Sequence, residues 1–154
     1  MNREQLKDLI EAIAALGIIV TLVFVVLEIR QNTDVARSAT VQAMAAQSYD
    51  AAMRITENPE LRAAYFAGHA GTPNESQRLQ LQTFYAAMIR LQLNRFEQIK
   101  LGIIDLDLAL QLGGRGDAYS SPFFVEYWGE IKQRYSPDFR NYIEHQVMEE
   151  SVLE

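Results

Sequence analysis

The feature that most constrains this chain is an uncharged apolar run of 16 residues near its N-terminus, Ala12 to Leu27. Eleven of these residues are Leu, Ile, Val or Phe. As a helix the run is about 24 Å long, and two more residues at each end bring it to about 30 Å, the thickness of a bilayer's hydrocarbon core. On an insertion scale the eleven side chains contribute about −3 to −7 kcal/mol. The sequence therefore predicts a transmembrane helix with Glu11 and Glu28 at its two interfaces.

Three other interpretations compete for the same run. Its β-branched stretches could form a buried strand, but no other segment of the chain has a strand pattern that could pair with it. The run could also be the central helix of a soluble bundle, or lie in an oligomer interface. A cleaved signal peptide is disfavoured because Glu28-Ile29-Arg30-Gln31-Asn32 follows the run, without a small-residue cleavage site. The membrane span remains the leading prediction.

The basic residues that flank the run do not by themselves determine its orientation. Arg3 and Lys7 precede it and Arg30 and Arg37 follow it, so the basic residues that mark a cytoplasmic side are balanced. The N-terminal tail also carries acidic residues, and short tails of mixed charge can be translocated. We therefore expect a single-pass protein of the bacterial inner membrane, with its C-terminal domain in the cytoplasm.

Four prolines divide the rest of the chain into helices. Each follows a residue that is favoured as a helix N-cap, and proline suits the first helical position because its missing N–H would have no intrahelical partner there. The four dipeptides are Asn58-Pro59, Thr72-Pro73, Ser121-Pro122 and Ser136-Pro137. Thr72 and Glu75 also have the spacing of a capping box.

The spacing of apolar residues between these four dipeptides predicts the helices. They cover residues 34–56, continuous with the span, then 59–67, 73–101 with Gly102 as its C-terminal cap, 105–112, 122–135 and 137–153. We therefore predict an all-α protein. Residues 1–29 would form an N-terminal tail and transmembrane helix, and residues 30–154 a small helical bundle of about five to six helices.

Composition excludes several classes of function. The net charge of −6 offers no basic face for nucleic acid, and cysteine is absent. The two histidines, His69 and His145, lack metal-ligand spacing. The glycines of residues 113–117 lack the strand and lysine of a phosphate-binding loop, and no nucleophile elbow is present. We expect no catalytic residues, no cofactor and no metal.

Two groups of residues are candidates for contacts. Arg90, Asn94 and Glu97 share one face of the predicted 73–101 helix, beside Arg95, and would either form a polar network or ligand pocket or remain a solvated stripe. An aromatic cluster around Trp128 would be core or a ligand surface. The set for a polar network or ligand contacts is Arg90, Asn94, Glu97, Asp105, Trp128 and Arg140. The set for close helix–helix contact consists of small residues: Ala14, Gly17, Thr21, Ala36, Ala39, Ala43 and Ala46.

Three segments carry a resemblance. They are Glu28-Ile29-Arg30-Gln31-Asn32-Thr33, the stretch from Phe96 to Asp105, and Ser136-Pro137-Asp138-Phe139-Arg140-Asn141-Tyr142-Ile143. With them the chain resembles a group of small bacterial proteins in which a membrane span runs into a (Glu/Gln)-Ile-Arg-Gln-Asn-Thr motif and a helical C-terminal body. Members often have a tryptophan after the Gly-x-x-Asp segment, where this chain has Leu108 and Leu110. The resemblance implies an anchor and a helical body, and no chemistry.

The functional expectation follows from these features. We expect a membrane-anchored helical protein that acts through protein contacts, as a homo-oligomer or with another membrane protein, in the lipid bilayer. The alternative is a sensory or ligand-binding module that holds a small molecule or lipid between the 73–101 helix and the aromatic C-terminal helices.

Overall fold

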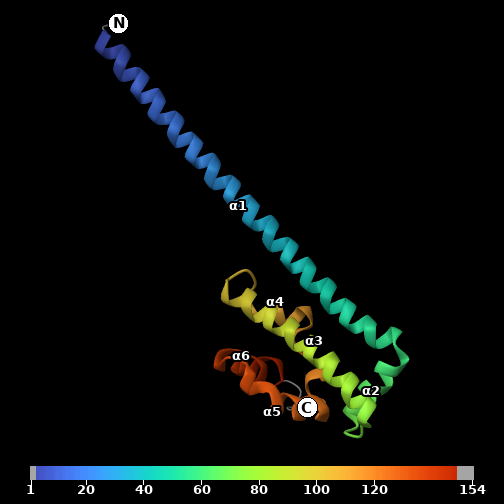
Figure 1. The fold of residues 1–154 in the computed structure, drawn as a ribbon. Helices are drawn as coiled ribbons and strands as arrows, with labels where there is room; N and C mark the ends of the chain where they lie inside the picture. The colour runs from blue at the N-terminus through green and yellow to red at the C-terminus, as the bar shows by residue number, and fades with distance from the viewer. Residues whose placement is uncertain (1–2, 149–154) are drawn as a thin grey trace. The chain divides into compact units, whose positions relative to one another are not determined.

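A computed structural model describes residues 3–148 of the chain, and every regular element in that range is helical (Figure 1). The prediction of an all-α protein is confirmed. The six α-helices are α1 (Arg3–Glu57), α2 (Pro59–His69), α3 (Glu75–Lys100), α4 (Leu106–Ala109), α5 (Pro122–Ile131) and α6 (Pro137–Tyr142). Short turns of π or 3₁₀ geometry are η1 (Leu110–Gly114), η2 (Asp117–Tyr119), η3 (Lys132–Arg134) and η4 (Ile143–Val147).

The chain divides into two compact units, residues 1–40 and 41–154. The predicted division lies after residue 29. Residues 31–39 are helical and exposed, and Met44 is the first buried side chain among those of α1 that the structure describes. The division therefore falls within α1, and each unit is described by itself.

The first unit is the N-terminal part of α1. The helix is unbroken through the apolar run, as predicted. The Thr21 hydroxyl donates a hydrogen bond to the Gly17 carbonyl oxygen at 2.9 Å, which satisfies the one polar side chain between Ile13 and Leu27 within its own helix.

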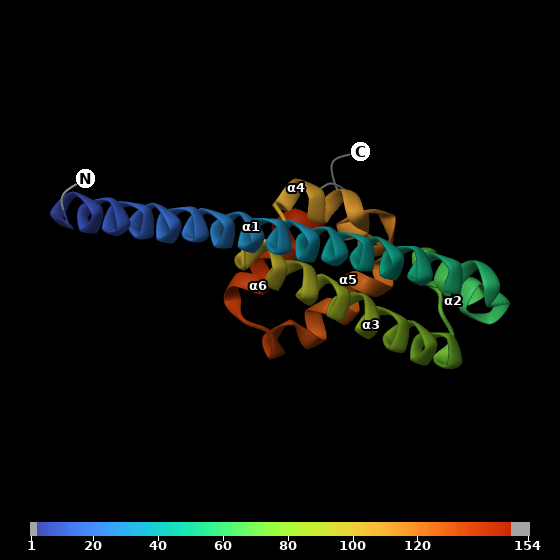
Figure 2. The same ribbon diagram turned by 90° about the horizontal axis from the view of Figure 1, so that it is seen from above.

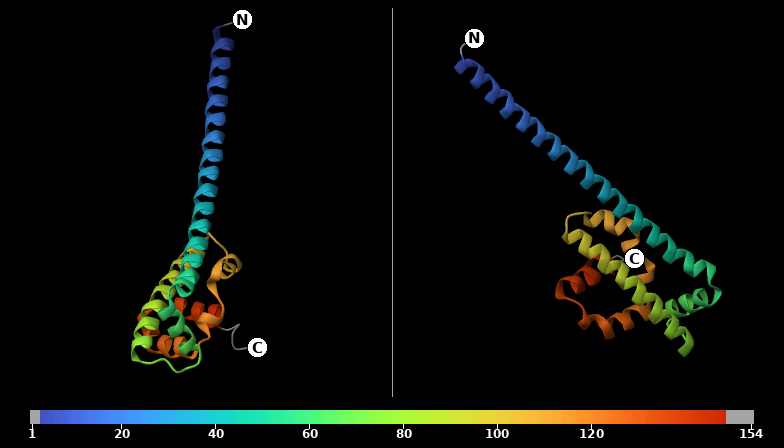
Figure 3. Two further views of the ribbon diagram at one scale, coloured as in Figure 1. Left: turned by 90° about the vertical axis from the view of Figure 1, so that its right-hand side faces the viewer. Right: turned by 45° about the horizontal axis from the view of Figure 1, so that its top comes forward.

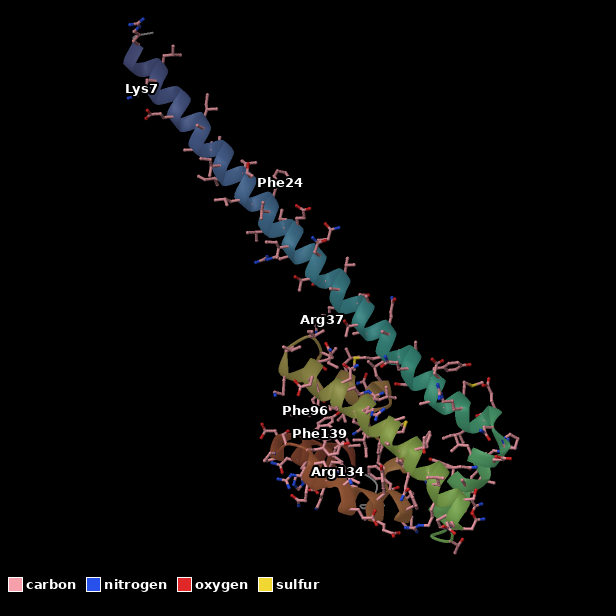
Figure 4. All side chains as sticks on the ribbon, viewed as in Figure 1. Lys7, Phe24, Arg37, Phe96, Arg134 and Phe139 are labelled. Carbon is pink, nitrogen blue, oxygen red and sulfur yellow. The ribbon has the colours of Figure 1, made fainter. Side chains whose placement is uncertain are left out.

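The second unit is built around α3. Helices α2, α5 and α6 pack against α3, and residues 41–57 of α1 lie along another side of it (Figures 1 and 3). The view in Figure 2 shows α3 and this part of α1 running side by side. The core is largely aromatic: the ring centroids of Phe96 on α3 and Phe139 on α6, both labelled in Figure 4, are 5.5 Å apart. A Cβ at buried Gly68 of α2 would lie 2.9 Å from Leu81 Cδ1, so any larger residue here would require the Leu81 side chain to shift.

Three of the four predicted N-caps are confirmed. The side chains of Asn58, Ser121 and Ser136 accept hydrogen bonds from the first turns of α2, α5 and α6, and each is followed by a proline in that turn.

The fourth predicted helix start, at Thr72-Pro73, is wrong. Helix α3 begins at Glu75, and Asn74 and Gln77 form its capping box through two reciprocal hydrogen bonds of 2.9 Å. The Thr72 amide is already used, because it donates to the Ala67 carbonyl oxygen at 2.9 Å and closes the C-terminus of α2. With Gly71 at φ +70° this is a Schellman motif, so Thr72 closes α2 while Asn74 caps α3.

The other ends need smaller corrections. Gly102 has φ +68° directly after the C-cap Leu101, so the predicted glycine terminus of α3 is confirmed. Helix α5 ends at Ile131 rather than residue 135, because η3 tightens its last turn. The predicted last helix is divided into α6 and η4, and the end predicted for it at residue 153 lies outside the described residues.

Candidate functional site

The largest surface feature of the first unit is the apolar run itself. All described side chains from Ile13 to Ile29 are exposed, and Phe24 has 67% of its surface accessible. In Figure 4 side chains project from this helix on every side around Phe24. A helix that is apolar on all sides is typical of a membrane span or of a buried central helix. One helix of the described chain, within Ile13–Glu57, is long and apolar enough to span a membrane, and none of its apolar window is buried.

Charged groups bound this surface at both ends. Lys7 and Glu11 form an exposed ion pair of 3.7 Å one turn apart, before the run. Glu28 and Arg30 are exposed directly after it. The uncharged length between Glu11 and Glu28 contains no side-chain polar group except Thr21, whose hydroxyl is bonded to Gly17. The run therefore has no unsatisfied side-chain donor to carry into a hydrocarbon phase.

The predicted helix–helix contact residues all lie exposed on α1. Ala14, Gly17, Thr21, Ala36 and Ala39 are in the first unit. Ala43 and Ala46 belong to the second unit and are also exposed. A Cβ added to Gly17 would meet nothing within 4 Å, so this position is open to another helix.

The polar residues predicted on α3 lie on its solvent-facing side. Arg90, Asn94 and Glu97 are all exposed. Glu97 pairs with Lys100 at 3.8 Å, and the Asn94 side-chain oxygen accepts a 3.4 Å hydrogen bond from Gln98. These are local contacts along one helix, as in the solvated-stripe alternative.

The other three predicted residues lie in separate places. Asp105 caps α4, accepting from the Leu108 amide at 2.8 Å. Arg140 donates to Gln133 at 2.6 Å on the surface. Trp128 is buried, and its indole N–H donates to Glu144 Oε1 at 3.2 Å. None of these contacts reaches Arg90, Asn94 or Glu97, so the structure does not bring the six residues together in one site.

A buried polar cluster lies on the other side of α3. It contains Arg95, which the sequence placed beside the exposed residues, and Gln92, which was not predicted. Gln92 and Arg95 are 0% and 2% exposed. Arg95 Nη2 donates to Ser48 Oγ at 2.5 Å and to the Leu112 carbonyl oxygen at 2.9 Å, which connects α3 to α1 and η1. The signal was present in the sequence: residues 92 and 95 continue the apolar spacing of Leu81, Tyr85 and Ile89.

Two buried tyrosines complete this cluster. The Tyr142 hydroxyl donates to Gln92 Oε1 at 3.1 Å, and burial raises the pKa of Tyr142 to about 12, against the opposing charge of Arg95. Burial also raises the pKa of Tyr119, while nearby Gln92 and Arg95 lower it. Tyr119 is 1% exposed and its hydroxyl has no hydrogen-bond partner among the described residues. We name Gln92, Arg95, Tyr119 and Tyr142 the polar core.

A groove of about 630 Å³ lies on a third side of α3, within the second unit. Residues 47–54 of α1, the start of α2 and residues 79–91 of α3 form its walls. Its apolar lining includes Leu61, Phe84, Met88 and Leu91. Arg90, Asn94 and Trp128 do not line it. The interface between α3 and the C-terminal helices, the ligand site of the alternative prediction, is packed with buried rings including Tyr85 and Phe124.

Polar groups at the groove are few. Gln80 lines it and has a buried Oε1 without a hydrogen-bond partner, and Asp50 and Arg54 lie on the α1 wall. An apolar cleft of this volume with a small number of polar groups is typical of sites for small molecules. Among the residues described, no three His, Cys, Asp or Glu side chains converge as metal ligands would.

Comparison of the chain with protein-family models, with curated proteins and with solved structures finds no match.

Proposed function

We propose that this chain is a single-pass protein of the bacterial inner membrane, anchored by the first unit of α1, with its helical second unit in the cytoplasm. Its function is to make protein contacts, with further copies of the chain or with another membrane protein. The observation that supports the proposal is the apolar run, which is exposed on all sides of an unbroken helix.

The magnitude of that exposure favours lipid over water. Burying one Val, Leu, Ile or Phe side chain is worth about 1.5–3 kcal/mol, so eleven of them left in water forgo roughly 15 to 30 kcal/mol. The whole net stability of a typical domain is about 5–15 kcal/mol. A surface of this size therefore needs a partner phase or a partner helix, and the satisfied Thr21 hydroxyl suits a hydrocarbon phase.

Membrane fractionation with a charge substitution tests the anchor. We expect the full chain to stay with membranes after alkaline carbonate extraction, and the double variant Val20→Arg/Phe24→Arg to leave them, because each central arginine costs about 2.5–3.5 kcal/mol of insertion free energy. The control Gln31→Arg/Val35→Arg places the same charges just beyond the run and should stay. Recovery of the unaltered chain as a compact monomer in the aqueous fraction would contradict the proposal.

The side of the membrane is tested separately. Green fluorescent protein fused to the C-terminus should fluoresce, and alkaline phosphatase fused there should be inactive, because the phosphatase needs the oxidising periplasm. The reverse pair of results would place the second unit outside the cytoplasm.

Self-association through the small-residue face is tested by disulfide crosslinking, which the chain's lack of cysteine makes direct. In native membranes Gly17→Cys should form a disulfide-linked dimer on mild oxidation, because a small-residue face allows two helices to approach closely. Ile19→Cys, on the opposite face of the same helix, is the control and should remain monomeric. Equal crosslinking at both positions, or none at either, would refute association through this face.

The groove supports a second candidate, a module that binds an apolar small molecule. Full-length protein should then enhance the fluorescence of the apolar probe 1-N-phenylnaphthylamine, and Ala87→Phe, which fills the groove, should abolish that enhancement. Ala63→Phe, at an exposed position of α2 outside the groove, is the matched control. Equal probe binding by both variants would exclude the groove as the site.

A further inference from the structure

The groove beside α3 contains a buried hydrogen-bond acceptor that the protein leaves unused. Gln80 lines the groove, and its Oε1 is buried without a donor among the described residues. Buried polar atoms are rarely left unsatisfied in folded proteins, because burial removes the hydrogen bond that water would otherwise supply. The Gln80 oxygen is therefore the point at which a ligand gains a hydrogen bond that the protein alone does not make.

The other polar side chains of the groove are either bonded within the protein or exposed. Asn58 Oδ1 accepts hydrogen bonds from the first turn of α2. The Thr83 hydroxyl donates to the Leu79 carbonyl oxygen at 3.0 Å, within its own helix. Gln47 is exposed to solvent. Among the described residues that line the groove, the buried acceptor that remains for a ligand belongs to Gln80.

The charges at the groove favour a neutral ligand. Asp50 and Arg54 lie one turn apart on the α1 wall, and both are exposed. They have opposite signs, and no further ionisable side chain is among the described residues of the lining. The groove thus offers no net charge to offset the cost of moving an ion from water into an apolar cleft.

The apolar side chains form a track that starts at Gln80. Phe84, Ala87 and Leu91 follow Gln80 along α3 at steps of four, three and four residues, which places them on one side of the helix. Residues 79–91 span about 18 Å of helix, so the track is long and narrow. Its shape matches an extended hydrocarbon chain with its polar end at Gln80.

We propose that this groove binds a neutral long-chain alcohol, whose hydroxyl donates a hydrogen bond to Gln80 Oε1 and whose chain lies along Phe84, Ala87 and Leu91. The proposal rests on the second candidate function, the binding of an apolar small molecule in the groove. A hydroxyl supplies the donor that a hydrocarbon or an ether lacks. An alkyl amine also has donors, but it is charged at neutral pH and costs more to remove from water.

The test compares decan-1-ol with its isomer nonyl methyl ether, which has the same atoms and no donor. Full-length protein in phosphatidylcholine nanodiscs carries a bimane label at Gln47→Cys, an exposed position in the groove of a chain that otherwise lacks cysteine. Bimane emission reports occupancy. Gas chromatography of the headspace gives the free concentration of each ligand, so partition into lipid does not enter the dissociation constants. We expect decan-1-ol to bind about tenfold more tightly than the ether.

Substitution of Gln80 assigns this preference to its oxygen. Gln80→Met keeps the length of the side chain and removes the acceptor, so the alcohol and the ether should bind equally. Gln82→Met, at a half-buried position of α3 outside the groove, is the matched control and should keep the tenfold preference.

The outcomes separate this inference from the function on which it rests. Equal dissociation constants in the parent protein would overturn the alcohol and leave apolar binding in the groove intact. Binding of neither ligand would overturn both. A preference that survives in Gln80→Met would also overturn the inference, because the hydroxyl would then have another partner. If Gln80→Met does not fold, the comparison of the two isomers in the parent decides.

Discussion

At the scale of single residues, α3 carries polar side chains on two sides, one exposed to solvent and one buried in the second unit. Arg90 and Asn94 face solvent, where a polar side chain needs no protein partner. Gln92 and Arg95 point into the second unit, where their hydrogen bonds reach α6, α1 and η1. A buried polar group is tolerated only when such partners exist, so these positions are defined by residues that are distant in sequence.

The environment of Glu144 is also set by residues distant in sequence, and it leads to a prediction about the pH dependence of stability. Its Oε1 accepts from Lys132 Nζ at 2.9 Å and from Trp128 Nε1 at 3.2 Å. The hydrogen bond from Lys132, with a smaller contribution from Trp128, holds the pKa of Glu144 below its ordinary value of 4.5. A lowered carboxyl pKa stabilises the fold above the unfolded pKa, and that stability is lost as the pH falls through the folded pKa.

We therefore expect Glu144→Gln to lower the free energy of unfolding by about 1 kcal/mol at pH 7, with a difference that shrinks as the pH falls below 4.5. Denaturant unfolding of the full chain in an uncharged detergent at pH 7 and at pH 3.5 measures both values. Glu130→Gln, an exposed carboxyl on α5, is the control and should change little. A Glu144→Gln penalty that is equal at the two pH values would contradict this assignment.

Ser121 and Ser136 form a matched pair for a second prediction. Each caps a helix ahead of a proline, but Ser121 is 1% exposed and its hydroxyl also bonds the Tyr85 hydroxyl at 2.9 Å. Ser136→Ala should lose about 1 kcal/mol, the value of one cap. Ser121→Ala should lose roughly 2–3 kcal/mol, because it also leaves a buried hydroxyl without its partner. Equal losses in denaturant unfolding would show that the Tyr85 contact adds nothing.

At the scale of elements, the helix ends are set by local chemistry that two adjacent elements share. The segment from Ala67 to Gln77 ends α2 with a Schellman motif and starts α3 with a capping box. Thr72 takes part only in the first motif and Asn74 only in the second. The residue that closes α2 and the residue that caps α3 are therefore different, although they lie only two positions apart.

Two substitutions test whether Asn74 rather than Thr72 caps α3. Asn74→Ala should lower the free energy of unfolding by about 1 kcal/mol, because it removes the acceptor for the Gln77 amide. Thr72→Ala should change it by less than about 0.5 kcal/mol, since only the Thr72 backbone is bonded and its side chain is exposed. Chemical denaturation of both variants in the same detergent provides the comparison. A larger loss for Thr72→Ala would restore the helix start predicted from sequence.

At the scale of the whole molecule, α1 belongs to two units with different surroundings. The described side chains of α1 up to residue 39 are exposed, and its last turns supply Met44 to a small core with Ile104 and Ala109. One continuous helix thus passes from an exposed apolar surface to a surface that packs in a core. The described buried side chains all come from Met44 onward, so the second unit has its own core.

We expect the chain shortened to residues 41–154 to be soluble without detergent and to unfold cooperatively, because it keeps all of these core residues. Near-UV circular dichroism of Trp128 and sedimentation measure its packing and association. A second truncation to residues 58–154 also removes Met44 and Ser48 and should unfold at lower denaturant concentration. A 41–154 chain that aggregates or lacks a cooperative transition would show that the first 40 residues are needed for folding.

Local patterns in the sequence determined the helical class, the apolar run and most helix boundaries. The run, the serine and asparagine caps with their prolines, and Gly102 act through contacts within a few residues, so they can be read without knowing the fold. The same locality explains why Asp105 was correctly placed at the start of a short helix.

Only the tertiary structure decided which polar residues are buried. Arg95 differs from Arg90 through Ser48, 47 residues away along the chain, and through the Leu112 carbonyl, and sequence spacing does not disclose such distant partners. The groove beside α3 and the polar core likewise arise where several helices meet. Burial and long-range hydrogen bonding are properties of the assembled helices, and these properties place the candidate sites on sides of α3 other than the exposed face of Arg90, Asn94 and Glu97.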